Sequence, residues 1–300
     1  MTINHTILDA IGKTPLLDMG DGILAKCEFL NPSGSIKARI AKYMIEKAEM
    51  EGLLRPGDTI VEATSGNTGN AMSMVAAIKG YRMIVVMPAG YTSERVKISR
   101  GLGAEIKFVG HFQVNDALRA AQELGAQEGY YCPRQFDNEW NVDENRDWLG
   151  QEIIAQIPET MRIDAIVQGV GTGGTLIGVS QALRQWHNDQ LKVYAMEPKE
   201  SRTLECCIVA DHQIEGISDG FVPTIYQRHR SEIDEIVSVE SETAIEVSKE
   251  LARKRGLFVG PSSGANVWAA QEIRRRNPEI KTVLTFLCDK AEKYLSLMYS

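Results

Sequence analysis

The stretch DTIVEATSGNTGNAMSMVAAIKGYRMIVVMP, residues 58–88, decides the fold of this chain. Residues 58–63 form an apolar, β-branched run typical of a buried strand, and 64–69 are the small residues of a loop. Residues 70–80 favour a helix, and 82–88 form a second apolar run. A strand, a helix and a strand in that order predict two parallel strands joined by a helix that covers one face of their sheet.

The same alternation continues along the rest of the chain. We expect further helices at 40–54, 92–103, 115–127, 148–157, 176–186 and 243–256. We expect further strands at 104–110, 129–133, 164–170, 191–198 and 282–288, and a strand and loop at 257–264. This pattern predicts an α/β fold of two parallel-sheet domains, a smaller one over 1–140 and a larger one over 141–300. The active site is expected in the cleft between them, where loops follow the carboxyl ends of the strands.

Composition narrows the possible partners. The formal net charge of −7 over 300 residues argues against a nucleic-acid partner. The five cysteines show no CxxC pairing, so we expect free thiols in a reducing compartment and no metal site. The N-terminus lacks the basic start and apolar core of a signal peptide, and no apolar run approaches the ~20 residues of a membrane span. We therefore expect a soluble, cytoplasmic protein with no membrane partner.

Residues 31–40, NPSGSIKARI, place Lys37 where a loop enters a helix. The positive end of the helix dipole disfavours an ammonium group at that position, and burial adds to the effect. An amine kept neutral in this way suits Schiff-base chemistry. On this segment alone, the alternative is a solvated lysine on an amphipathic helix.

Three further loops join a strand to a helix. Residues 64–69, TSGNTG, combine hydroxyl and amide side chains with free backbone N–H groups, which favours an anion such as a carboxylate. Residues 171–175, GTGGT, let the backbone approach a phosphate monoester, although they lack the spacing of a dinucleotide-binding loop. For each of these two loops the alternative is a glycine-rich turn without a ligand. Residues 260–264, GPSSG, are interpreted as a packing and cofactor-lining loop, because no histidine follows them to complete a hydrolase triad.

Taken together and in order, these segments resemble the cysteine synthase family, the O-acetylserine sulfhydrylases and cystathionine β-synthases. These are pyridoxal-phosphate enzymes of fold type II, similar in fold to the β-subunit of tryptophan synthase. The similarity covers nearly the whole chain. Besides the lysine loop, the matching segments are IGKTPLL at 11–17, MIEKAEMEGLLRPGDTIVEATSGNTGNA at 44–71, MPAGYTSERVKISRGLGAEI at 87–106, QFDN at 135–138, GTGGTLIGV at 171–179, GISDGFVP at 216–223, GLFVGPSSGA at 256–265 and EKYLS at 292–296.

The resemblance implies pyridoxal 5′-phosphate as cofactor, with Lys37 forming the Schiff base and later acting as the base at the α-carbon. It implies that five residues hold the substrate carboxylate: Thr64, Ser65, Asn67, Thr68 and Gln135. It assigns Asn67 also to the phenolic oxygen of the cofactor. It implies that one loop cradles the cofactor phosphate: Gly171, Thr172, Gly173, Gly174 and Thr175. The family's architecture further implies that the larger domain binds the cofactor, that residues 12–34 cross over to it, and that the enzyme is a homodimer.

Several positions depart from the family pattern. Ala38 follows the lysine where the family usually has Asp, and Asp219 stands where typical sulfhydrylases have a small uncharged residue. An ungapped alignment places Lys290 where the family has a serine facing the pyridine nitrogen. Because a charged lysine cannot accept a proton from that nitrogen, either the pyridine stays unprotonated or Cys288 lines the ring. Asp219 is either a turn residue or a catalytic base that handles a proton at the β-carbon.

The resemblance implies β-replacement, in which elimination from a small amino acid gives an aminoacrylate and a nucleophile then adds to it. The leading interpretation is cysteine synthesis from sulfide and an activated serine such as O-acetylserine. The alternative is β-replacement on cysteine itself, with water or a thiol releasing hydrogen sulfide and leaving serine or a thioether such as lanthionine or cystathionine. A third interpretation is an inactive paralogue that serves as a binding partner.

Overall fold

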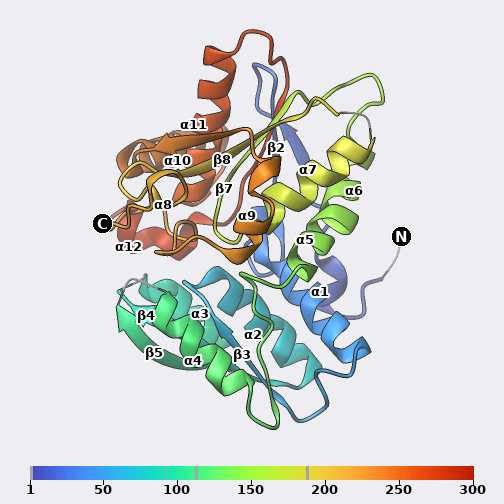
Figure 1. Cartoon of the computed structure of the whole chain (residues 1–300), viewed down its shortest axis with the longest axis vertical. Coiled ribbons are helices and arrows are strands. Elements are labelled where there is room, and N and C mark those ends of the chain that lie inside the picture. The colour runs from blue at the N-terminus through green and yellow to red at the C-terminus, as the bar shows by residue number, and fades with distance from the viewer. Residues whose placement is uncertain (1–2, 91, 112–113, 187–188) are drawn as a thin grey trace.

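The computed structural model describes residues 3–90, 92–111, 114–186 and 189–300. Within these residues the strands form two sheets: one of four strands, the small sheet, and one of six, the large sheet. Figure 1 shows the small sheet below the large one, with helices packed around each. No helix in the described ranges is long and apolar enough to cross a membrane.

The small sheet is built from the segment between residues 37 and 131. Its elements, in chain order, are α1 (Lys37–Met50), β3 (Thr59–Ala63), α2 (Asn67–Lys79), β4 (Arg82–Ala89), α3 (Ser93–Gly101), β5 (Glu105–His111), α4 (Asn115–Gly125) and β6 (Tyr130–Tyr131). The strands are parallel in the order β5-β4-β3-β6. Strand β3 is buried along its whole length because helices cover both faces of the sheet. Successive side chains of a strand point to opposite faces, so Ile60 packs with α1 and α2 while Val61 packs with α4.

The large sheet combines both ends of the chain. Its elements are β1 (Leu16–Asp18), β2 (Ile23–Lys26), α5 (Trp140–Glu144), α6 (Gln151–Gln156), β7 (Ala165–Gly169), α7 (Gly174–Trp186), β8 (Lys192–Pro198), α8 (Thr203–Cys206), α9 (Thr224–Arg228), β9 (Glu235–Val239), α10 (Ser241–Arg255), α11 (Pro261–Arg276), β10 (Val283–Phe286) and α12 (Leu295–Met298). The strand order is β1-β2-β10-β7-β8-β9. Short 3₁₀ turns lie at Ile7–Ala10, Glu28–Leu30, Arg230–Glu232 and Ala291–Tyr294. Strand β2 pairs with β10, and the chain then enters α1 on the small sheet (Figure 1).

Two expectations about the elements of the large sheet were incomplete. The helix expected at 148–157 begins at Trp140 and ends at Gln156, with a wider π-type turn at Asn145–Gly150 between α5 and α6. Strands β1, β2 and β9 were not expected. They are short, and their pairing depends on partners that are mostly distant in sequence. Strand β1 is antiparallel to β2, so this edge departs from an all-parallel sheet.

A strand and a loop were expected at 257–264, and the strand does not form among the described residues. Val259 makes one isolated bridge to Lys290, and helix α11 already begins at Pro261. Proline suits the first turn of a helix, because its fixed φ is helical and its missing N–H has no partner there. The GPSSG segment is therefore the start of a helix.

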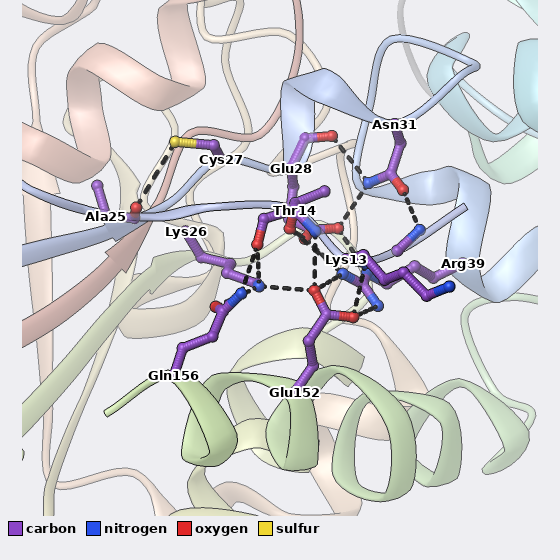
Figure 2. A network of polar contacts seen from close by, with 11 residues as sticks. Lys13, Thr14, Ala25, Lys26, Cys27, Glu28, Asn31, Arg39, Glu152 and Gln156 are labelled. Carbon is purple, nitrogen blue, oxygen red and sulfur yellow. Dashed lines mark hydrogen bonds and ion pairs between the residues drawn. The ribbon is translucent and has the colours of Figure 1, made fainter. Parts of the chain in front are cut away.

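A buried cluster of charged and polar residues ties α1 to the large sheet. We call Thr14, Lys26, Glu28, Arg39 and Glu152 the Arg39 cluster. Arg39 donates to Glu28 at 2.7 and 2.9 Å and to Glu152 at 2.9 and 3.0 Å (Figure 2). Lys26 of β2 donates to Glu152 of α6 at 2.7 Å and to the carbonyl of Thr14 at 2.6 Å. Because Arg39 lies in the first turn of α1, the cluster fixes that turn against β2 and α6.

Candidate active site

A cavity lies where loops from the carboxyl ends of β3, β7 and β10 meet the first turn of α1. In parallel sheets this end of the strands is where ligands bind. Most of the site residues predicted from the sequence line this cavity: Lys37, Thr64, Ser65, Asn67, Thr68, Gln135, Gly171, Thr172, Asp219 and Cys288. The fold therefore brings together segments that are up to about 250 residues apart in the chain.

Lys37 is the first residue of α1, and its half-buried side chain lines the cavity. The loop before it is fixed to the large sheet, since the Ile36 N–H donates to the carbonyl of Cys288 at 2.8 Å. Burial lowers the pKa of Lys37, and the charges of Asp289 and Asp219 oppose that shift. A lowered pKa raises the fraction of neutral amine, which is the form that attacks a carbonyl group.

The predicted carboxylate loop joins β3 to α2. The Thr64 hydroxyl accepts from the Gly66 N–H at 2.9 Å, so its own hydrogen can point to an anion. The Thr68 hydroxyl donates to Gln135 Oε1 at 2.6 Å, and Gln135 Nε2 donates to the carbonyl of Ala63 at 2.8 Å. Thr68 and Gln135, both predicted to hold the carboxylate, are thus bonded to each other in this structure. The second N–H of the Gln135 amide stays available to a ligand.

The predicted phosphate loop lies between β7 and α7. The Thr172 hydroxyl accepts from Asn141 Nδ2 at 3.0 Å and from the Gly174 N–H at 3.2 Å, which leaves its own hydrogen for an anion. Gly171 is pressed against another loop: a Cβ there would lie 2.5 Å from the carbonyl oxygen of Gly216. Only a glycine therefore permits this close approach of the two backbones.

The rest of the predicted phosphate cradle starts helix α7. Gly173, Gly174 and Thr175 are not among the residues that line the cavity. The first N–H groups of a helix have no partner within it, and the helix dipole adds positive potential there. The cavity wall thus offers the Thr172 hydroxyl, just before the start of α7, and a lysine amine of lowered pKa. These donors fit the phosphate and the aldehyde of pyridoxal phosphate.

Cys288, and not Lys290, stands in the cavity wall. Gln168 Nε2 and Asn266 Nδ2 each donate to Cys288 Sγ at 3.3 Å, and Ser262 is hydrogen-bonded to the same thiol. Burial raises the pKa of Cys288 to about 11, so the thiol keeps its proton near neutral pH. Of the two candidates for the pyridine nitrogen, only Cys288 is therefore among the cavity-lining residues, and it shares that wall with Ser262.

Asp219 is buried in the cavity wall near the carboxylate loop. Burial raises the pKa of Asp219, while the charge of His212 and a hydrogen bond from Ser65 oppose the shift. The backbone carbonyl of Asp219 also accepts the N–H of Val114 at 3.3 Å, which joins this loop to the small-sheet side. Asp219 is therefore a buried acidic residue of the cavity lining.

Other cavity residues were not predicted from the sequence, among them Phe136, Gln168, Glu215 and Ile217. Gln168 lies near the carboxyl end of β7, a position that could have indicated it. Ser262 belongs to the GPSSG segment, which was interpreted as cofactor-lining, and it lines the cavity. Glu215 forms an ion pair with Arg95 of α3, a contact between distant segments that no local pattern indicates. In the parts of the chain that the structure describes, no cluster of three or more His, Cys, Asp or Glu side chains is arranged to hold a metal ion.

Comparisons with known proteins identify the family of the chain. Residues 7–289 match the family described as pyridoxal-phosphate dependent enzyme. The chain is 40% identical to O-ureido-L-serine synthase of Streptomyces lavendulae, over 99% of this chain and 92% of that protein. It is 39% identical to a cysteine synthase of Staphylococcus aureus, over 97% of this chain and 95% of that protein.

Solved structures show the same similarity in three dimensions. A crystal structure of O-ureido-L-serine synthase has a TM-score of 0.91 at 40% identity, covering 98% of this chain and 94% of that one. A hydrogen sulfide-producing enzyme of Fusobacterium nucleatum has a TM-score of 0.90 at 36% identity, covering 96% of this chain and 89% of that one. The likeness thus extends over nearly the whole chain, and the chain belongs to the family of pyridoxal-phosphate-dependent enzymes.

Proposed function

We propose that this enzyme replaces the β-substituent of an activated serine, such as O-acetylserine, with sulfide to give cysteine. The observation that carries the proposal is that Lys37, the carboxylate loop and Thr172 line one cavity. When bound, the cofactor supplies a conjugated ring that withdraws electrons from the substrate α-carbon. Relatives named cysteine synthase, at 39% identity over nearly the full chain, support the same reaction.

The roles proposed for the residues are those that the family resemblance implies, and the positions of the residues in the cavity support them. Lys37 holds the cofactor and then takes the α-proton, for which its lowered pKa suits it. The Thr64 hydroxyl and the start of α2 hold the substrate carboxylate, which orients the α-proton toward the lysine. Thr172 and the start of α7 hold the cofactor phosphate, and Asn67 donates to the cofactor's phenolic oxygen.

A product assay tests the proposal. Purified enzyme is incubated with O-acetylserine and sulfide, and in parallel with cysteine alone, and the amino-acid products are separated and identified. Cysteine formed quickly in the first reaction, with little sulfide released in the second, is the expected result. Sulfide release from cysteine at the higher rate would make cysteine the substrate and overturn the synthetic direction.

A second candidate is β-replacement on cysteine, with water or a thiol as the nucleophile. The buried carboxyl group of Asp219 favours it, because a base in the cavity wall can take a proton from water or a thiol. Sulfide is already largely ionised near neutral pH and needs no such base. The hydrogen sulfide-producing relative is consistent with this chemistry.

Substitution of Asp219 separates the two candidates. Asp219→Asn should keep the change in the visible spectrum that follows substrate addition, because this change needs only Lys37 and the carboxylate loop. It should lose turnover with water or a thiol and keep most of its turnover with sulfide. Equal rates for every nucleophile in variant and wild type would return Asp219 to the role of a turn residue.

We also propose a division into domains at residues 140/141, a homodimer and a cytoplasmic location. The division is supported by the small sheet lying within 59–131, while β1 and β2 cross to the large sheet.

The proposal of a homodimer rests on the family resemblance, and light scattering on the purified protein measures the oligomeric state. The reducing compartment is supported by five unpaired cysteines.

A further inference from the structure

The C-terminal segment that follows β10 reaches across to Asn67, the first residue of α2. Asn67 Nδ2 donates to Asp289 Oδ2 at 2.6 Å, and Lys293 Nζ donates to Asn67 Oδ1 at 2.8 Å. These partners are more than 220 residues from Asn67 in the sequence. A cavity-lining side chain on the small sheet is therefore held by charged groups that belong to the large-sheet side of the molecule.

The two bonds define which way the Asn67 carboxamide faces. A flipped amide would turn its NH₂ group toward the ammonium of Lys293 and its oxygen toward the carboxylate of Asp289, and both contacts would be repulsive. The Tyr294 hydroxyl, 3.4 Å from Asn67 Nδ2, is itself bonded to Asp289 Oδ2. Tyr294 and Asp289 therefore lie on the same side of the amide. The second N–H of Asn67 remains for a ligand in the cavity.

Asp289 and Lys293 are themselves fixed and almost fully buried, at 1% and 3% exposure. The backbone of Asp289 bridges to Ser35 and accepts the N–H of Gly260 at 3.0 Å. Lys293 Nζ donates also to the carbonyl of Ser33 at 3.0 Å. The pair is thus anchored to the loop just before Lys37 and to the start of α11. The Asn67 carboxamide therefore cannot move unless Asp289, Lys293 and the segments that hold them move as well.

The pKa of Lys293 depends on the charged groups around it, including the carboxylate of Asp289. Burial lowers the pKa of Lys293 to about 8; the charge of Asp289 opposes this shift, Arg95 and Lys290 add to it, and Glu292 opposes it. Near neutral pH, Lys293 is therefore still a charged donor toward Asn67. The charge of Asp289 acts also on Lys37, where it raises the pKa.

We propose that Asp289 and Lys293 are positioning residues that fix the Asn67 carboxamide with one N–H directed to an anionic oxygen of the bound cofactor. The inference rests on the proposed contact between Asn67 and the cofactor. It gives a task to two buried charged residues in the segment that follows β10. It also explains why two opposite charges are buried beside an uncharged side chain.

The test is a double-substitution cycle on cofactor binding. Pyridoxal phosphate is titrated into cofactor-free wild type, Lys293→Met, Asn67→Ala and the double variant, and the dissociation constant and visible absorption maximum are recorded. Loss of the Asn67 donor should weaken binding roughly tenfold to a hundredfold. Lys293→Met should weaken cofactor binding by part of that factor, and it should shift the absorption maximum in the same direction as Asn67→Ala does. The double variant should bind no more weakly than Asn67→Ala alone.

The matched control is Lys290→Met, the same chemical change three residues earlier at a side chain outside the cavity, and it should bind as wild type does. Should Lys293→Met not fold, Asp289→Asn carries the same cycle with a smaller effect, because it keeps a neutral acceptor. Multiplicative losses in the double variant would show that Lys293 acts independently of Asn67, and would overturn the inference. None of these readouts uses an amino-acid substrate, so a failed product assay and a failed cycle are separate results.

Discussion

Replacement of Arg39 by methionine should be among the most destabilising single changes in this protein. The guanidinium has no exposed area and donates to Glu28 and Glu152, and the Glu28 carboxylate is equally buried. In Arg39→Met, Glu28 keeps the hydrogen bonds that Thr14 and Asn31 donate to it. Removing one member of a buried ion pair costs about 3–5 kcal/mol, because the other charge stays behind without compensation.

The same geometry predicts strong coupling within the pair. Glu28→Met removes the second charge, so the double variant Arg39→Met/Glu28→Met should be more stable than the sum of the single losses predicts, by about 2 kcal/mol or more. Methionine fills a volume close to that of both side chains, which limits the cavity left behind. Arg100→Met, on the exposed surface of α3, is the matched control and should change stability by about 0.5 kcal/mol or less.

Urea unfolding of the cofactor-free protein, followed by circular dichroism, measures these differences in the free energy of unfolding. The free energy of unfolding measured at acidic pH gives a second readout. Burial opposes ionisation of Glu152, but hydrogen bonds from Arg39 and Lys26 lower its pKa to about 2. Its stabilising contribution is fully present above the ordinary value of 4.5 and is lost as the pH falls toward 2, and Arg39→Met should shrink this acid loss. A loss below about 1 kcal/mol for Arg39→Met, or strict additivity in the double variant, would refute the reasoning.

Two further predictions concern the site, and a third concerns the pH dependence of stability. The purified protein should be yellow, and borohydride reduction followed by peptide mapping should place the cofactor on Lys37; a label on another lysine would contradict the assignment. Thr172→Val should weaken cofactor binding, by roughly tenfold or more, through loss of a charge-assisted hydrogen bond. Thr68→Val should spare cofactor binding and raise the KM for the amino-acid substrate, so equal cofactor loss in the two variants would mean that the loop roles are misassigned. Burial raises the pKa of Glu62 to about 8, so the folded state binds a proton that the unfolded state loses, and stability should fall as the pH rises from about 4.5 to 8. Glu62→Gln should flatten this slope in thermal unfolding, and an unchanged slope would remove Glu62 as its source.

Local features of the sequence were enough for the main elements near the cavity. The segment 58–88 carries its own strand, loop, helix and strand, because apolar periodicity and small loop residues act over short distances. The loop–helix position of Lys37 is equally local. For the same reason, the chemistry of the hydroxyl-rich and glycine-rich loops could be assigned to anions before any fold was known.

Tertiary structure alone decided how these parts meet. The sequence contains no local signal that β2 pairs with β10, that the Thr68 hydroxyl donates to Gln135, or that Glu215 pairs with Arg95. The orientation of Asn67 depends on Asp289 and Lys293, which stand at the far end of the chain. Propensity and periodicity describe a residue's neighbours along the chain, whereas ion pairs, hydrogen bonds and cavity walls form between groups that only packing brings within a few ångströms. The composition and position of each loop could therefore be recognised from the residues around it in the sequence. The arrangement of the loops around one cavity depends on the packing of one sheet against the other.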